Sequence, residues 1–537
     1  MRRDLIVVLT TVAAMAATQT AVAQTAAPAK PATATAPKAV VKATPAATPA
    51  ATPAATKATP AATVAPAKPT TATPAKPATS AATPATTATA ATAPAGACTA
   101  ATPLIAAGNI AVAMGQNDVA TTDFNRAVDR APRCASAWLR RAEYVFAQHS
   151  YDKAVADATT AIARDPRNGE AYALRASARL YAAGSDGETD PQARGTAIVA
   201  DLDRATDLGL TDPMILMERG VGHMVMGDKT QAFADMDRAV ALEPTNAKWL
   251  IVRAGAHEEA GDHDLAIADY AQARTRPTAD AEQRTTSFGG GIRAFAAKGD
   301  TDGAIALAGD AIAAEPKNPY YYELRANLYV RKQAYDPAIA DFSTIIGLDD
   351  DSASKHINRA MAYTEKGDYA AALADTNVAI ELDPGDSANF VGRGHVFERK
   401  GDVTAAMADY DHAATLPARG ATFRAANAAC AIRATNNIEL DKALAYCNAA
   451  LDLYPDYGAA LDSRGFVHVR LKQYDAAVSD YTAALKLQPG AASSLFGRAL
   501  AEQKLGKTED AATDLAAARA VDSGIDAKFK GYGITAQ

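Results

Sequence analysis

The sequence predicts an all-α fold, a solenoid of about twelve helix-turn-helix repeats that follows a disordered tether. Three observations predict it. Hydrophobic residues make up 49% of the 537 residues but aromatic residues only 6%, so the core must consist of small side chains in close contact, as between packed helices. A motif of small residues and one aspartate recurs from residue 101 to residue 525. Residues 24–97 are almost wholly Ala, Pro, Thr and Lys, a composition that cannot build a core.

Residues 1–23 have the pattern of a secretory signal peptide. Arg2 and Arg3 precede an apolar run, and the small residues that follow it end at Ala23 in a cleavage site of the A-x-A type. The apolar run is short for a bilayer span. We therefore expect an exported chain, periplasmic or secreted, with no transmembrane span after cleavage; the alternative is an uncleaved N-terminal anchor.

Residues 24–97 form the predicted tether. Frequent prolines forbid helix, and no large apolar side chain offsets the entropy of ordering, so we expect an extended, polyproline-like linker. All of its charges are basic: Lys30, Lys38, Lys42, Lys57, Lys68 and Lys76. These lysines either keep the linker solvated or attract it weakly to an anionic envelope surface.

The repeat becomes visible when the copies are aligned on the last position of the small-residue motif in each copy. Eight of the eleven intervals are 34 residues long, and the others are 44, 38 and 37. Each unit is a helix hairpin that buries little alone, so stacked copies must complete one another's cores. The aligned places are Ala127, Ala161, Ala205, Ala239, Ala273, Ala311, Ile345, Ala379, Ala413, Ala450, Ala484 and Ala518.

The copy that begins at Ala135 shows the pattern most fully, with Trp138, Ala154 and Pro166 at the expected spacings. A 34-residue helix-turn-helix unit of this kind resembles the tetratricopeptide repeat. The resemblance covers residues 101–525 and implies a right-handed α-solenoid whose first helices line a concave groove. Two features depart from the family pattern: arginine stands where leucine is usual, and the tyrosine of the first helix is mostly absent.

The longer intervals predict where the array divides. We expect repeats 1–5 at residues 101–284, repeats 6–9 at 285–423 and repeats 10–12 at 424–525, followed by a C-terminal tail at 526–537. A ten-residue insertion in the third copy, residues 184–193, is expected to project as a loop.

An arginine and an aspartate recur together across the hairpin. With Ala135 counted as place 1 of its copy, place 7 is Arg and place 23 is Asp in nine of twelve copies, and these places lie level across the turn. We interpret the pairs as a structural ion-pair ladder; the alternative is that the arginines bind an anionic ligand. The pairs are Arg141/Asp157, Arg175/Asp201, Arg219/Asp235, Arg253/Asp269, Arg325/Asp341, Arg359/Asp375, Arg393/Asp409, Arg464/Asp480 and Arg498/Asp514.

The four cysteines predict disulfides rather than a thiolate cluster. Cys430 and Cys447 hold places 7 and 24 of a copy that lacks the ion pair, and export would expose them to an oxidising environment. We expect a disulfide between them in place of the missing bridge, against an alternative of free buried thiols. Cys98 and Cys134 flank the first hairpin and form a second candidate pair.

The first helices predict the binding surface. Places 2, 5, 9 and 12 should face the groove, and in the copy that begins at Pro213 they are apolar. Methionine-rich strips adapt to varied apolar partners, so we expect a peptide groove here; the alternative is that these methionines only seal a contact between copies. The residues of this predicted groove are Leu139, Phe146, Met214, Met217, Val221, Met224 and Ile251. A polar sector of Glu323, Asn327, His395, Glu398 and Arg399 and a second apolar sector of Phe466, Val469, Phe496 and Leu500 follow.

No catalytic motif, metal site or cofactor site is predicted. The Gly-Lys-Thr at 506–508 lacks the earlier glycine of a phosphate-binding loop, and the acidic and histidine residues at 257–263 fall at an ordinary solvated turn. A net charge of -7 argues against nucleic acid. We therefore predict a non-enzymatic scaffold of the cell envelope that binds a protein or peptide; the alternative is an anchoring module that recognises an envelope glycan or peptidoglycan.

Overall fold

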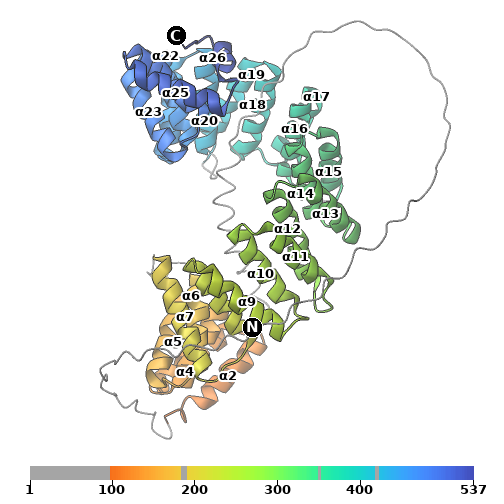
Figure 1. The fold of residues 1–537 in the computed structure, drawn as a ribbon, viewed down its shortest axis with the longest axis vertical. Coiled ribbons are helices and arrows are strands. Elements are labelled where there is room, and N and C mark those ends of the chain that lie inside the picture. The colour runs from red at the N-terminus through yellow and green to blue at the C-terminus, as the bar shows by residue number, and fades with distance from the viewer. Residues whose placement is uncertain (1–96, 183–189, 349–351, 418–421, 537) are drawn as a thin grey trace, which may run out of the picture. The chain divides into compact units, whose positions relative to one another are not determined.

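The computed structural model describes residues 97–182, 190–348, 352–417 and 422–536. Those ranges contain 25 helices and no strand, which confirms the predicted all-α solenoid (Figure 1). Twelve hairpins, which we call copies 1 to 12, precede one short final helix. The predicted signal peptide and, except for residue 97, the predicted tether lie outside the described residues.

The first helices of copies 1 to 12 are α2 Thr102–Ala113, α4 Ala135–Ala147, α6 Gly169–Ala182, α8 Pro213–Val225, α10 Ala247–Ala260, α12 Ala281–Ala297, α14 Pro319–Arg331, α16 Ala353–Lys366, α18 Ser387–Lys400, α20 Thr422–Asn436, α22 Gly458–Arg470 and α24 Ala492–Lys504. The second helices are α3 Asn117–Arg130, α5 Tyr151–Arg164, α7 Pro191–Asp207, α9 Lys229–Leu242, α11 His263–Thr275, α13 Thr301–Ala314, α15 Tyr335–Leu348, α17 Tyr369–Leu382, α19 Val403–Thr415, α21 Leu440–Leu453, α23 Tyr474–Leu487 and α25 Thr508–Val521. The final helix is α26, Ile525–Gly531.

The turn between the two helices of a copy passes through the left-handed region of backbone conformation. Glycine enters this region without a steric penalty, and Gly261, Gly367 and Gly401 do so with φ of 83°, 87° and 89°. In other copies Gln333 and Lys472 hold the same conformation, with φ of 59° and 61°. The turn is therefore imposed by the packing of the hairpin, even where the residue carries a Cβ atom.

Small residues let the helices approach closely. In copy 2, Ala142, Ala154 and Ala161 are fully buried between the two helices. Between copies, the ring of Tyr270 lies against Gly290, where an added Cβ would come within 2.3 Å of the ring. Only glycine permits this approach, so the small-residue pattern fixes the contact within a copy and also the contact with the next copy.

Neighbouring first helices contact each other along most of the array, whereas successive second helices make no comparable contact within the described residues. The first helices therefore lie on the inner side of the local curve, and we call the surface that they form the inner face. Among the neighbouring first helices described, α14 and α16 contact each other least. Along the inner face, the backbones of neighbouring first helices thus approach each other least between copies 7 and 8.

Irregular copies extend their helices. Helices α7 and α12 are both 17 residues long, because α7 begins within the predicted insertion and α12 begins before residue 285. The insertion is therefore not a loop throughout: Asp190 caps α7 and Pro191 begins it, while residues 183–189 lie outside the described ranges. The predicted boundaries at 284/285 and 423/424 fall inside α12 and α20.

The predicted C-terminal tail contains α26, which packs on the last copies. Ile525 and Phe529 of this helix are buried in a cluster with Phe466 and Phe496 from the first helices of copies 11 and 12. The arginine Arg470 donates a hydrogen bond to the backbone carbonyl of Tyr532. The tail therefore ends the solenoid by covering apolar side chains of α22 and α24, the first helices of copies 11 and 12.

Candidate binding surface

The structure brings together all nine predicted arginine–aspartate pairs. In each pair Nε and Nη2 of the arginine donate to the two carboxylate oxygens of the aspartate over 2.6–2.9 Å. Bidentate, charge-assisted bonds of this kind hold both side chains in one geometry, and hydrogen bonding to Asp269 raises the pKa of Arg253. Arginines committed in this way have few donors left for an anionic ligand.

The aspartates of these pairs are buried and present no surface to a partner. Each is only 4–8% exposed, because it projects from the second helix of its copy toward the first, where the arginine takes both of its oxygens. They therefore belong to the core of the hairpin and not to a binding surface. The nine buried aspartates are Asp157, Asp201, Asp235, Asp269, Asp341, Asp375, Asp409, Asp480 and Asp514.

Most of the ladder arginines also reach the preceding copy, a contact that the sequence did not reveal. Nη1 of Arg253 donates to Asp237 on the second helix of copy 4 over 2.6 Å, and Arg393 reaches Asn377 of copy 8 over 2.8 Å. The acceptor stands at place 25 of the earlier copy, where residue types vary. The other contacts of this kind are Arg141–Asn125, Arg175–Thr159, Arg219–Asp203, Arg359–Ser343, Arg464–Asn448 and Arg498–Thr482.

Copy 10 lacks both partners of the pair and is held by other chemistry. Cys430 and Cys447 form a disulfide with their Cα atoms 5.4 Å apart. Arg433, with 0% exposure, donates to Asp411 of copy 9 over 2.8 Å and to Glu439 over 2.9 Å. The disulfide thus spans the hairpin and Arg433 makes the link to the preceding copy.

Cys98 and Cys134 form a second disulfide, across the start of the array, and no described cysteine is free. Copy 6, which also lacks the ion pair, is closed by apolar contact: a Cβ added at Gly291 would lie 2.9 Å from Leu307. The two copies that lack both partners of the ion pair are therefore held by different contacts.

The predicted methionine groove is wrong at its centre. Leu139, Met217 and Ile251 all occupy place 5, and they are only 2%, 1% and 2% exposed. The physical reason is that place 5 faces the next copy: Met217 packs in one buried cluster with Met236 and Trp249. These three residues belong to the core between copies and present no surface to a partner.

The remaining predicted groove residues are half-buried. Met214, Val221 and Met224 pack against the cluster that contains Met217, and Phe146 packs edge-on against the ring of Tyr181, with centroids 5.4 Å apart. These contacts favour the alternative interpretation, in which the methionines seal a contact between copies. Met214 also lines the cavity described below.

The second apolar sector is covered by the protein itself. Phe466, Val469, Phe496 and Leu500 are at most 9% exposed, because Phe529 of α26 lies with its ring centroid 4.5 Å from that of Phe496 and 5.5 Å from that of Phe466. The inner face of the last copies is therefore occupied.

The polar sector is the open part of the predicted surface. Glu323 and Asn327 on α14 are exposed, and neither side chain has a hydrogen bond or ion pair to another described residue. Their neighbours are partly engaged: Glu398 accepts from the hydroxyl of Tyr410 over 2.8 Å, and Arg399 lies 3.3 Å from Glu365. His395 is half-buried on α18.

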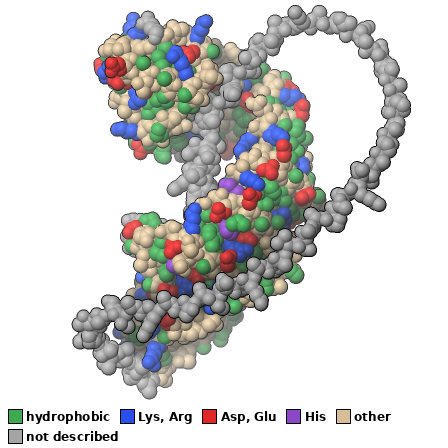
Figure 2. Space-filling model, in the orientation of Figure 1, with side chains coloured by type: hydrophobic (Ala, Val, Ile, Leu, Met, Phe, Trp, Pro, Cys, Tyr) green, Lys and Arg blue, Asp and Glu red, His purple; other side chains and the backbone are tan. Residues whose placement is uncertain are grey.

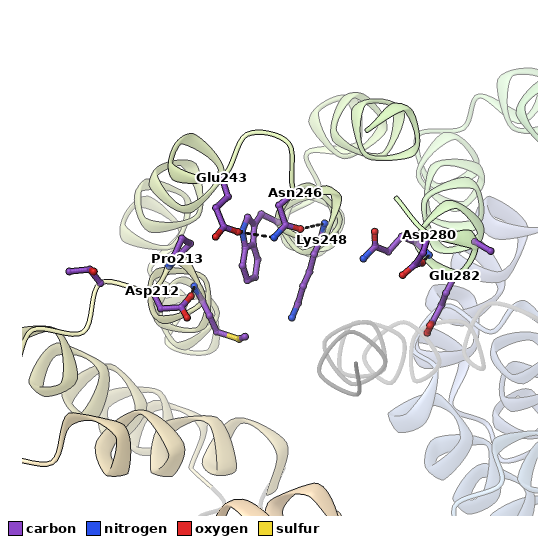
Figure 3. Close-up of a pocket in the computed structure, with 12 residues that line it drawn as sticks. Asp212, Pro213, Glu243, Asn246, Lys248, Asp280 and Glu282 are labelled. Atoms are coloured by element: carbon purple, nitrogen blue, oxygen red, sulfur yellow. Dashed lines mark hydrogen bonds between the residues drawn. The ribbon is translucent and has the colours of Figure 1, made fainter. Parts of the chain in front are cut away.

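A cavity of about 830 Å³ lies where α8, α10 and α12 begin (Figure 3). Its size is typical of ligand sites. Helix caps and first-turn residues from three successive copies form its walls, and Figure 3 shows Lys248 extended between Asp212 on one side and Asp280 and Glu282 on the other. The residues that line it are Thr211, Asp212, Pro213, Met214, Glu243, Asn246, Lys248, Trp249, Asp280, Ala281, Glu282 and Gln283.

A buried glutamate interacts electrostatically with two residues that line this cavity. Glu218 of α8 is 3% exposed and accepts hydrogen bonds from the hydroxyl of Ser177 over 2.8 and 2.9 Å. Burial is the chief cause that raises its pKa from 4.5 to about 7. The charge of Asp212 also raises the pKa, while the hydrogen bond from Ser177 and the charge of Lys248 lower it. The glutamate and the lysine of the cavity are thus electrostatically linked.

The surface of the middle repeats carries charges of both signs. Figure 2 shows acidic and basic side chains interspersed on the face drawn, without a large area of one sign. No helix in the described ranges is long and apolar enough to cross a membrane.

The fold and the stacked copies define an α-solenoid assembled from helix hairpins, and sequence comparison names its family. Tetratricopeptide repeats match residues 105–168, 217–281, 291–354 and 464–525, and a further tetratricopeptide repeat matches residues 356–386. Together the matches span more than half of the chain, so this protein belongs to the tetratricopeptide repeat family. Repeats of this family generally serve as scaffolds for protein–protein interaction. No curated protein matches the sequence.

Solved structures of similar architecture include yeast Tom70, with 16% identity, a TM-score of 0.42 and coverage of 81% of this chain and 94% of that chain. The APC/C hetero-tetramer Cut9-Hcn1 has 14% identity, a TM-score of 0.37 and coverage of 81% and 96%. A tetratricopeptide repeat protein from Parabacteroides merdae has 19% identity, a TM-score of 0.36 and coverage of 48% and 98%. Similarities of this size carry no argument about function.

Proposed function

We propose that this protein is a non-enzymatic scaffold of the cell envelope that binds a protein or peptide segment along the inner face of its middle copies. The observation that carries the proposal is the contrast in how polar side chains are used. The ladder arginines are committed to the fold, whereas Glu323 and Asn327 are exposed and have no partner among the described residues. They lie on α14, the first helix whose backbone approaches that of the next first helix least.

The location in the envelope is supported by the signal-peptide pattern of residues 1–23 and by the cysteine pairs, which suit an oxidising compartment. If the N-terminus stays anchored, the length of the lysine-bearing tether, residues 24–97, would set how far the scaffold reaches from the membrane. If the signal peptide is cleaved, the tether would be the free N-terminal extension of the scaffold. Weak attraction of those lysines to an anionic envelope surface belongs to the same proposal.

Site-specific photo-crosslinking in the expressing cells tests this function. A photoreactive residue replaces Glu323 on first helix α14 in one variant and Glu381 on second helix α17 in another; both glutamates are exposed. We expect a discrete protein to crosslink at 323 and to rebind the purified chain, with little capture at 381. Equal capture at both positions, or glycan fragments at 323 in place of protein, would overturn the proposal.

A further inference from the structure

The cavity where α8, α10 and α12 begin is rich in hydrogen-bond acceptors. Four carboxylates line it, from Asp212, Glu243, Asp280 and Glu282, against the single amine of Lys248. The carboxylate of Glu243 accepts from Trp249 Nε1 and Asn246 Nδ2, each over 2.8 Å. The other three carboxylates keep capacity that the fold does not use.

Two of these carboxylates are helix caps. One oxygen of Asp212 accepts from the backbone N–H of Met214, and one oxygen of Asp280 accepts from that of Gln283. In the described residues the second oxygen of each aspartate has no hydrogen bond. Helix N-termini ordinarily favour anions, but here acidic caps take the free N–H groups and leave their own negative charge facing the cavity.

A second and independent observation comes from Gln283. This side chain lines the cavity and is 9% exposed, and no described residue donates a hydrogen bond to its Oε1. A buried amide oxygen without a donor has lost its hydrogen bonds to water and gained none from the fold. The missing component of the cavity is therefore a hydrogen-bond donor, the same requirement that the carboxylates indicate.

The existing lysine is engaged with its own neighbours. Lys248 is 8% exposed, and its Nζ lies 5.1 Å from the centre of the Trp249 ring. Its charge also acts on buried Glu218. The lysine therefore forms part of the cavity wall. Pro213 and Met214 supply apolar surface beside the acidic groups, against which the carbon stem of an incoming side chain can pack.

We propose that this cavity binds a lysine or arginine side chain of the partner segment. The apolar wall holds the stem, and Asp280, Glu282 and the Gln283 oxygen receive the donors of its cationic head. The inference rests on the proposed function and adds a specific requirement to it: the partner carries a basic residue that docks at the start of α10.

Tryptophan fluorescence gives a direct measurement, because the chain has only 2 tryptophans and Trp249 lines the cavity. In a Trp138→Phe background of the full chain, we would titrate capped heptapeptides that differ only at a central arginine, lysine, citrulline or glutamate. We expect a saturable change with arginine and lysine that weakens with salt. Citrulline should bind at least tenfold more weakly, and glutamate should not bind.

Substitutions in the cavity provide the matched comparison. The double variant Asp280→Asn and Glu282→Gln should weaken the arginine peptide at least tenfold, and asparagine keeps the helix cap. The control is Asp228→Asn with Glu509→Gln, an equal loss of charge at another exposed cap and first turn, which should change nothing.

Equal binding of arginine and citrulline, tighter binding of glutamate, or no effect of the cavity variant would overturn the inference. The crosslinking at residue 323 distinguishes a failure of this inference from a failure of the proposed function. If a protein is captured there while the cavity ignores basic peptides, the scaffold stands and the cavity assignment falls. If a basic peptide binds but no partner is captured, the proposed function fails.

Discussion

Copy 5 and copy 10 fold into the same hairpin but are held by different chemistry. In copy 5, Arg253 binds Asp269 across the hairpin and Asp237 in the preceding copy. In copy 10, the Cys430–Cys447 disulfide spans the hairpin and buried Arg433 reaches back to the preceding copy. The comparison shows that both of these hairpins have two linkages, one internal and one to the preceding copy, although the residue types differ.

The two solutions act on different states of the chain. A disulfide stabilises mainly by restricting the unfolded chain, whereas the ion pair acts in the folded state by satisfying a buried carboxylate. Copy 10 should therefore respond to reducing conditions and copy 5 should not.

The largest effect is expected from removal of the Cys430–Cys447 disulfide. The bridge closes a sequence separation of 17 residues, for which the chain-entropy relation gives about 3 kcal/mol. The double variant Cys430→Ala and Cys447→Ala should lose protection from hydrogen exchange in α20–α23 while copies 2 to 5 keep theirs. Unchanged exchange in copy 10 would show that Arg433 alone holds this hairpin.

A smaller effect is expected from the ladder. Asp269→Asn removes the charge from a carboxylate that is 4% exposed and leaves Arg253 without its bidentate partner, so we expect a loss of about 2 kcal/mol. Asp237→Asn removes the other acceptor of the same arginine, but the Asp237 side chain is 64% exposed, so its loss should be under about 1 kcal/mol. Equal losses of unfolding free energy would contradict the distinction between the two linkages.

Glu258 is a half-buried acid in the same copy as Asp269, and it would be a poor surface control for this series. Its carboxylate accepts from the Tyr270 hydroxyl over 2.6 Å and lies 3.5 Å from Arg293. Asp237 is the better control, because it touches the same guanidinium as Asp269 and differs chiefly in exposure.

Copy 4 extends the comparison to a buried acid without an arginine. Its ladder aspartate, Asp235, is bound by Arg219, whereas Glu218 has a pKa raised from 4.5 to about 7. Because the folded chain binds this proton more tightly than the unfolded chain, stability is full below about pH 4.5. It falls as the pH rises toward 7 and changes little above that.

Raising the pH from 6 to 8 should therefore cost about 1 kcal/mol through Glu218. Glu218→Gln should remove this part of the pH dependence, while Asp235→Asn should lower stability and leave the slope between pH 6 and 8 in place. Denaturant unfolding of the three proteins at both pH values measures the difference. A slope that survives in Glu218→Gln would assign the titration to another group.

The sequence was informative where a linkage recurs with the same residue types. The arginine and aspartate at places 7 and 23 were visible because the pair recurs in nine of twelve copies and two of the other three copies lack both residues. The cysteines were visible because they lie at places 7 and 24 of a copy that lacks the pair. The contact at place 25 was hidden because asparagine, threonine, serine and aspartate all accept a hydrogen bond there.

Surfaces that depend on the next copy could not be read from the sequence. The position of Met217 within its helix was predicted, but its burial depends on Trp249 in the following copy. The burial of Phe466 and Phe496 likewise depends on a final helix whose position the 34-residue repeat does not specify. The cavity draws residues from three copies, so no single repeat contains its pattern.

The smallest expected effect compares two copies that share the ladder and differ in the turn. Copy 8 turns at Gly367, with φ of 87°, and copy 7 turns at Gln333, with φ of 59°. A residue with a Cβ atom in this region carries a penalty of about 1 kcal/mol. Gln333→Gly should therefore stabilise copy 7 by about 0.5–1 kcal/mol, and Gly367→Gln should destabilise copy 8 by a similar amount.

Gln333→Ala is the control, because it removes the exposed side chain but keeps the Cβ atom, and it should change the unfolding free energy by only a few tenths of a kcal/mol. The three variants separate backbone conformation from side-chain contact at one turn. If alanine and glycine stabilise copy 7 equally, the left-handed backbone is not the cause. If glycine alone does so, the Arg325–Asp341 pair and its neighbours hold the turn in a conformation that Gln333 itself disfavours.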